Sequence, residues 1–167
     1  CKGMVDLLDK IKEIEAALKA GCQHCALALT LTLPDICAKV LQSETKGHSN
    51  GEKYIEWFDK YVVPIYAPLG KIDKSFVTGK ICYKLRCSFL HAGNFDLEME
   101  NIYFNIHSRI KSEKQGYYNL GKGVNGKTII DIDAVGLCNA ICEAAKSFYN
   151  DTENKDLFRD KYIRDID

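Results

Sequence analysis

One stretch, from Cys22 to Gln42, constrains the fold more than any other because it is apolar on almost every side. Its apolar residues recur at helical spacing, and Leu27 and Leu31 add a second face to the main stripe. Leucine at every other position up to Leu33 is also compatible with a strand, but the length and the alanine and leucine content favour a helix. Pro34 predicts a kink or a new helix start near Leu33. We therefore expect a central helix that other elements surround. Its main stripe consists of Cys22, Cys25, Ala26, Leu29, Leu33, Ile36, Cys37 and Val40.

The other strongly periodic segments are also helical. Met4 to Ala20 is amphipathic, and Glu52 to Ala67 carries an aromatic stripe that is typical of a core-facing helix. Lys80 to Asn94 is predicted as a helix that stops at Gly93, and Asp133 is predicted as the N-cap of a last long helix. The sequence thus predicts a mainly α protein, a helical bundle of four to five helices.

A short stretch before the last helix has a different pattern. Apolar and polar residues alternate from Asn101 to Ile110, which predicts a half-buried strand, and a second short strand is predicted from Lys127 to Asp131. Asn125-Gly126 is typical of a hairpin turn. We therefore predict a small antiparallel β-hairpin or sheet, inserted at about residues 101–132 before the C-terminal helix.

Composition and charge restrict the class of protein. The chain has 167 residues, 46% hydrophobic and 28% charged, which suits one domain over residues 1–167. Its formal net charge is zero, so no field of one sign indicates a nucleic-acid or membrane partner. No apolar run is long enough to span a bilayer, and the charged segment from Lys2 to Lys19 is unlike a signal peptide. We expect a cytoplasmic protein with no membrane partner.

The chain contains eight cysteines. We interpret most of them as reduced thiols that serve as small apolar side chains in a helical core. A zinc site is the alternative, because Cys22-Gln23-His24-Cys25 has half of a metal-site spacing. The second half is missing unless the fold brings Cys138 and Cys142 nearby. We expect no metal and no cofactor, with the zinc alternative left open.

Two cationic or titratable side chains interrupt the apolar helix from Lys80 to Asn94. They are Arg86 and, five residues later, His91. A third polar residue in apolar company is Asp35, which follows Pro34. Asp35 is expected either to cap the backbone groups that Pro34 leaves free or to pair with a buried base, for which Arg86 is the candidate.

The segment Arg86-Cys87-Ser88-Phe89-Leu90-His91 resembles the signature of the HEPN superfamily, small helical-bundle proteins that are often dimeric and include many metal-independent ribonucleases. The spacing and the place near a helix end match, whereas Cys87 stands where the family usually has Asn or another polar residue. The resemblance implies an endoribonuclease that acts on RNA as a homodimer. Arg86 and His91 would be catalytic, with Arg86 on the scissile phosphate and His91 transferring protons. Ser88 and Asn94 would orient the histidine or the phosphate, with Asp35 in support.

A different class of function explains the same residues. A helical step of about 100° places Arg86 and His91 about 140° apart, an awkward geometry for one phosphate within a single chain. A histidine in the last turn of a helix is stabilised by the helix dipole, and an arginine in a bundle can serve only to pair with a carboxylate. The alternative is therefore a non-catalytic helical module that binds or regulates a partner.

Overall fold

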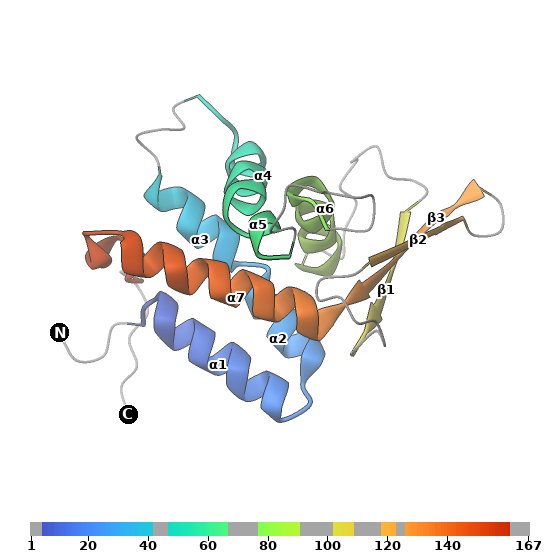
Figure 1. Cartoon of the computed structure of the whole chain (residues 1–167), viewed down its shortest axis with the longest axis horizontal. Coiled ribbons are helices and arrows are strands. Elements are labelled where there is room, and N and C mark those ends of the chain that lie inside the picture. Colours follow the sequence, from blue (N-terminus) through green and yellow to red (C-terminus); the bar gives the residue numbers. More distant parts are fainter. Residues whose placement is uncertain are drawn as a thin grey trace.

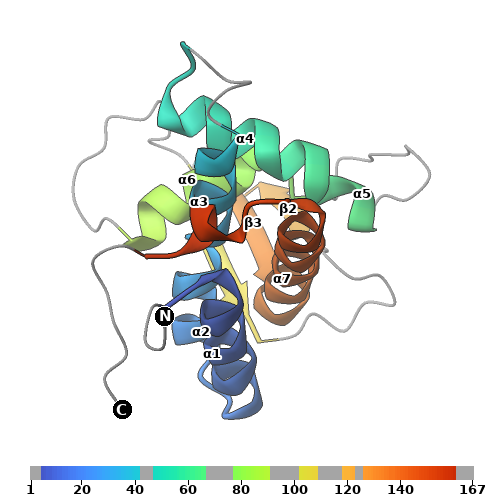
Figure 2. The ribbon, with the colours of Figure 1, turned by 90° about the vertical axis from the view of Figure 1, so that its left-hand side faces the viewer.

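A long C-terminal helix, α7 (Ala134–Asp151), forms the axis around which the other helices are arranged. The computed structural model describes residues 5–41, 47–66, 77–90, 102–108, 118–122 and 126–160. In these ranges α7 packs against α1, α2, α3, α4 and α5. Figure 1 shows α7 from the side, and Figure 2 shows it nearly end-on. The mainly α fold with a small sheet before the last helix is confirmed. The helices before α7 are α1 (Leu7–Lys19), α2 (Gln23–Thr30), α3 (Leu33–Val40), α4 (Asn50–Tyr61), α5 (Val63–Tyr66) and α6 (Gly79–Leu90).

The central apolar stretch forms two helices instead of one. The chain breaks after α2 and starts again as α3, with Pro34 in the first turn of the new helix. Proline fits there because the first turn has no intrahelical use for its missing N–H. Leu27, Leu31 and Leu33 are fully buried, which confirms the helix and the new start. Cys22 and Cys25, both expected in the buried stripe, are exposed. With α2 and α3 taken together and α5 as a short continuation of α4, the bundle matches the predicted four to five helices.

The core-facing stripe of α7 is rich in small residues, which lets neighbouring helices approach closely. Its start is fixed as predicted, because a side-chain oxygen of Asp133 accepts a hydrogen bond from the Gly136 N–H at 3.0 Å. Phe148 makes edge-to-face contacts with Trp57 on α4 and with Phe158 in the short 3₁₀ helix Lys155–Phe158. The buried residues of the stripe include Leu137, Cys138, Ile141, Cys142 and Ala145.

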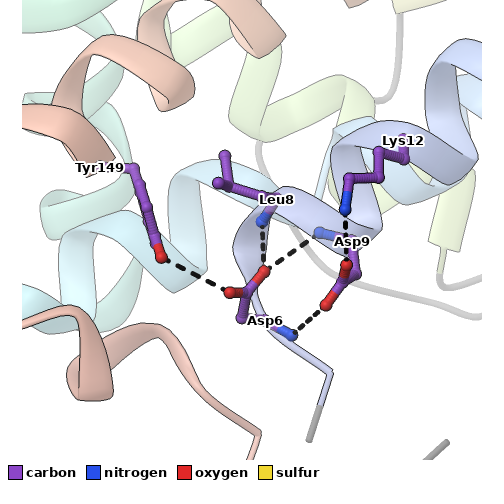
Figure 3. A network of polar contacts seen from close by, with 5 residues as sticks. All are labelled: Asp6, Leu8, Asp9, Lys12 and Tyr149. Carbon is purple, nitrogen blue, oxygen red and sulfur yellow. Dashed lines mark hydrogen bonds and ion pairs between the residues drawn. The ribbon is translucent and has the colours of Figure 1, made fainter. Parts of the chain in front are cut away.

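A polar network fixes the first turn of α1 against the end of α7, as Figure 3 shows. Asp6 Oδ1 accepts hydrogen bonds from the backbone N–H groups of Leu8 at 2.8 Å and Asp9 at 3.1 Å. Asp9 in turn accepts from the Asp6 N–H at 3.2 Å, which completes a capping box, and pairs with Lys12 at 3.0 Å. The Tyr149 hydroxyl reaches Asp6 at 3.5 Å. The first helix is thereby oriented along α7.

The sheet lies at one end of the bundle and has the strand order β1–β3–β2. The strands are β1 (Ile102–His107), β2 (Tyr118–Lys122) and β3 (Thr128–Asp133). The β2–β3 pair is antiparallel, and Gly126 in its turn has a φ of 74°. The β1–β3 pair is parallel, so the prediction of a wholly antiparallel sheet was wrong. A parallel pair needs a long connection, which the chain between β1 and β3 provides by way of β2.

Some predicted helix boundaries shift by a few residues. The helix expected from residue 52 begins at Asn50, where Ser49 and Glu52 form a capping box, and it divides at Val62 into α4 and α5. The predicted helix stop at Gly93 and Asn94 lies outside the described residues. Across the described part of the chain, no helix combines the length and the apolar character that a membrane crossing requires.

Candidate functional site

A cleft opens where three helices meet, α3, the first turns of α4, and the middle of α6. Its volume is about 270 Å³. Helix α4 packs against both α3 and α6, so it holds the two walls of the cleft together. Charged and polar side chains line most of it. The lining residues are Asp35, Ala38 and Lys39 from α3, Asn50 and Lys53 from α4, and Tyr83 and Arg86 from α6.

An ion pair between Asp35 and Arg86 joins α3 to α6 at this cleft. Arg86 Nε donates to Asp35 Oδ2 at 2.7 Å, and each side chain is 21% exposed. The pairing of these two residues, 51 positions apart, is confirmed. The contact uses Nε, and Arg86 Nη1 also donates to Cys87 Sγ at 4.0 Å, so two contacts orient the guanidinium. The guanidinium also lies 5.8 Å from the ring centroid of Tyr83, within the range of a cation–π contact.

Burial and charge oppose each other at this pair. Burial raises the pKa of Asp35, against the lowering effects of Arg86 and Lys39. Burial lowers the pKa of Arg86, but the charge and hydrogen bond of Asp35 outweigh it, so that pKa is raised. Because the folded pKa of Asp35 lies above its unfolded value, its contribution favours folding most at acid pH and declines as the pH rises through the folded pKa. The ionised form of Asp35 therefore lowers the stability of the folded protein, but its carboxylate orients Arg86.

The two lysines of the cleft differ from Arg86 in having no such partner. Within the ranges that the structure describes, neither Lys39 nor Lys53 forms an ion pair with a carboxylate. The C-terminal end of α3 and the N-terminal end of α4 both reach the cleft, and their dipoles act in opposite directions. The side chains therefore set the charge of the cleft, and the described ones that line it are three cations and one carboxylate.

A glycine allows Tyr83 to form one wall of the cleft. A Cβ added at Gly51, in the first turn of α4, would lie 2.9 Å from the Cζ atom of Tyr83. The ring of Tyr83 also contacts that of Tyr54, with centroids 5.3 Å apart. Tyr54 itself is buried, and its hydroxyl donates to the Leu31 carbonyl at 3.2 Å. The aromatic wall is thus anchored in the core.

The structure brings together some of the residues predicted for the site. Arg86 and Asp35 meet in the cleft. Ser88 is exposed and does not line it, since two helical steps separate its side chain from that of Arg86. His91 and Asn94 lie outside the described residues, so the predicted relation between Arg86 and His91 stays a prediction.

Other cleft residues were not predicted as site residues. Lys39 follows Asp35 by four positions and Tyr83 precedes Arg86 by three, so each shares a helix face with a predicted residue. That spacing was an available signal. Lys53 and Asn50 had no such signal, because they come from a different helix that the fold places opposite.

The described cysteines form no disulfide, and most are buried. Cys22 and Cys25 are exposed, whereas Cys37, Cys82, Cys87, Cys138 and Cys142 are buried. Burial raises the pKa of Cys82 to about 12 and that of Cys138 to about 11, which makes these thiols poor nucleophiles. Within the described ranges, no three His, Cys, Asp or Glu residues are grouped so as to hold a metal ion.

Comparisons with known proteins leave the site to be argued from its own geometry. A scan against models of protein families, a search of curated proteins and a search of solved structures each found no match.

The Asp35–Arg86 pair can be tested by replacing each partner with an apolar residue of similar size. Asp35→Leu and Arg86→Met are each expected to lower the free energy of unfolding by about 2 kcal/mol, because each leaves an unpaired, mostly buried charge. The double variant should lose less than the sum of the two, since it leaves neither charge behind. Urea unfolding measures all three. Strictly additive losses would mean that the pair is not energetically coupled.

Proposed function

We propose that the protein is a metal-independent endoribonuclease of the HEPN type that acts on RNA as a homodimer. The observation that supports this most is the oriented guanidinium of Arg86, held by Asp35 through Nε at the wall of a cationic cleft. Arg86 lies five residues before His91, at the spacing of the HEPN signature. The proposal joins this geometry to the chemistry that the signature implies.

Arg86 would bind the scissile phosphate. Its Nε is engaged by Asp35, and the terminal nitrogens of a guanidinium carry the N–H groups that phosphate oxygens accept. These donors can stabilise the negative charge that builds on the phosphate oxygens in the transition state. In this scheme Asp35 is a positioning residue, since its carboxylate contacts Arg86 and not the substrate.

His91 would transfer the protons. In one role it removes the proton of the ribose 2′-hydroxyl, whose oxygen then attacks the adjacent phosphorus, and the bond to the 5′-oxygen breaks. In the other role a protonated His91 gives a proton to that leaving 5′-oxygen. The nucleophile belongs to the substrate, so this step needs no metal-activated water, and DNA lacks the reacting hydroxyl. Two chains related by a two-fold axis would bring two Arg86 and two His91 side chains into one site.

A mixing experiment tests the shared site. Arg86→Ala and His91→Ala proteins are each expected to be inactive alone, and their mixture is expected to regain part of the wild-type cleavage. The reason is that exchanged dimers can combine an intact arginine from one chain with an intact histidine from the other. Cleavage of a fluorescent RNA is the measurement, with sedimentation showing that chains exchange. Exchanged dimers without recovered cleavage would contradict a site shared between two chains.

The second candidate is a non-catalytic helical module that binds or regulates a partner. The observation in its favour is the same ion pair, because Arg86 already has a carboxylate partner and links α3 to α6 as an architectural residue would. This candidate predicts a folded protein that cleaves no RNA. Its Arg86→Ala variant should be less stable than the wild type, because Arg86 would serve only to hold α3 and α6 together.

A further inference from the structure

We infer that the cleft between α3, α4 and α6 binds a phosphomonoester, the terminal phosphate of a nucleotide. Among the described residues, three cations, Lys39, Lys53 and Arg86, line a cavity of about 270 Å³ together with one carboxylate, Asp35. Asp35 Oδ2 already accepts a hydrogen bond from Arg86 Nε at 2.7 Å. Within the described ranges neither lysine forms an ion pair with a carboxylate, although the charge of Lys39 also acts on Asp35. Both lysines line the cavity, where a ligand can reach them.

The charge balance of the cleft selects the kind of phosphate. Three cations against one carboxylate leave a formal excess of two positive charges. A phosphomonoester carries a charge of about −1.5 to −2 at neutral pH, whereas a phosphodiester carries only one negative charge. Because Arg86 and Asp35 balance each other, this excess equals the charge of Lys39 and Lys53, and a terminal phosphate matches these two lysines more closely than a phosphodiester does. Both lysines can contact it as point charges, which leaves Arg86 with Asp35.

Size and the remaining lining residues point to a nucleotide. A volume of about 270 Å³ lies just below the usual range of small-molecule sites, which suits one phosphorylated sugar or nucleotide and not a folded segment. Tyr83 offers an aromatic wall and a hydroxyl, and Asn50 offers an amide that can both donate and accept. These two residues provide apolar and hydrogen-bonding contacts beyond the phosphate. The phosphate itself would lie with Lys39 and Lys53.

This ligand can come from two sources with the same chemistry. One is a free nucleoside 5′-monophosphate, and the other is the 5′-phosphorylated end of an RNA strand. The RNA source rests on the proposed function, because it makes the cleft a recognition site for the end of the substrate. The free nucleotide does not rest on it.

Calorimetric titration of the full chain with adenosine 5′-monophosphate tests the inference, with adenosine as the matched ligand that lacks the phosphate. The monophosphate is expected to bind at least about tenfold more tightly than adenosine, because only it can use the charged contacts. In the Lys39→Ala/Lys53→Ala variant this preference should fall by about tenfold or more. The Lys19→Ala/Lys80→Ala variant loses the same charge at exposed positions outside the cleft and should keep the preference.

A second arm separates the two sources. A short RNA with a 5′-phosphate and the same RNA with a 5′-hydroxyl are titrated against the His91→Ala variant under the same salt. A preference for the phosphorylated RNA that depends on Lys39 and Lys53 supports the inference even where the free nucleotide binds weakly. The inference is overturned if neither phosphorylated ligand is preferred, or if the control variant loses the preference equally.

The two arms also keep the inference separate from the proposed function. Phosphate-dependent binding without any RNA cleavage would contradict the proposed ribonuclease and support the cleft as a nucleotide-binding site. RNA cleavage without any preference for a terminal phosphate would contradict phosphate binding in the cleft and support the proposed ribonuclease.

Discussion

The Gly79→Ala variant is expected to unfold with a free energy about 3 kcal/mol lower than that of the wild type. Gly79 is the first residue of α6, and a Cβ placed there would lie 2.5 Å from the carbonyl oxygen of Ile55 and 3.0 Å from Asp59 Oδ1. The first of these is backbone of α4 and cannot rotate away. Helix α6 must therefore move off α4, which weakens the hydrogen bond from the Gly79 N–H to Asp59 Oδ1, now 2.6 Å.

Without this clash, alanine at the start of a helix would be more stable than glycine by up to about 1 kcal/mol. The sign of the change in unfolding free energy therefore shows whether the clash exists. Urea unfolding monitored by circular dichroism is the measurement. Gly51→Ala is the matched control, because the three atoms nearest to its Cβ all lie at the end of the Tyr83 side chain, which is part-exposed, and not in backbone. We expect a loss below about 1 kcal/mol there. Equal losses for the two variants, or a stabilised Gly79→Ala protein, would contradict the close packing of α6 on α4.

This packing matters for function because α6 carries Arg86 and Tyr83. A displacement of α6 would lengthen the contact between Arg86 Nε and Asp35 Oδ2, now 2.7 Å, and would open the cleft. Gly79 thus acts at a distance on the candidate site through the position of its helix. The reduced stability of Gly79→Ala should therefore be accompanied by weaker binding of adenosine 5′-monophosphate.

The local elements could be predicted from the sequence because each follows from short-range chemistry. Helical spacing identified α1, α4 and α7, and Asp133 was recognisable as an N-cap from its residue type and place. The Asp35–Arg86 pair was predictable for a different reason. A carboxylate and a guanidinium that each interrupt an apolar stripe cannot be buried separately at an acceptable cost, so each needs the other.

Features that depend on the arrangement of distant segments could not be predicted. Alternation identified β1 as a strand, and the isoleucines after the turn identified β3. Neither pattern contains information on direction, and a parallel pair was taken for an antiparallel one. The cleft likewise depends on how distant segments pack together. Lys53 was an ordinary residue at the start of a predicted amphipathic helix, and Asn50 lay just before that helix. Only the packing of α4 between α3 and α6 places them opposite Arg86.

The most direct test of the proposed ribonuclease is cleavage of RNA in the presence of EDTA by the wild type and by His91→Ala. We expect the wild type to cleave, and the folded variant to lose activity by about a thousandfold, since general acid–base catalysis contributes about that much. His107→Ala is the control, because His107 pairs with Asp131 on the sheet at 3.0 Å and has no part in the proposed site. It should cleave like the wild type. A wild type that cleaves no structured or unstructured RNA, or a His91→Ala protein that remains fully active, would contradict the account.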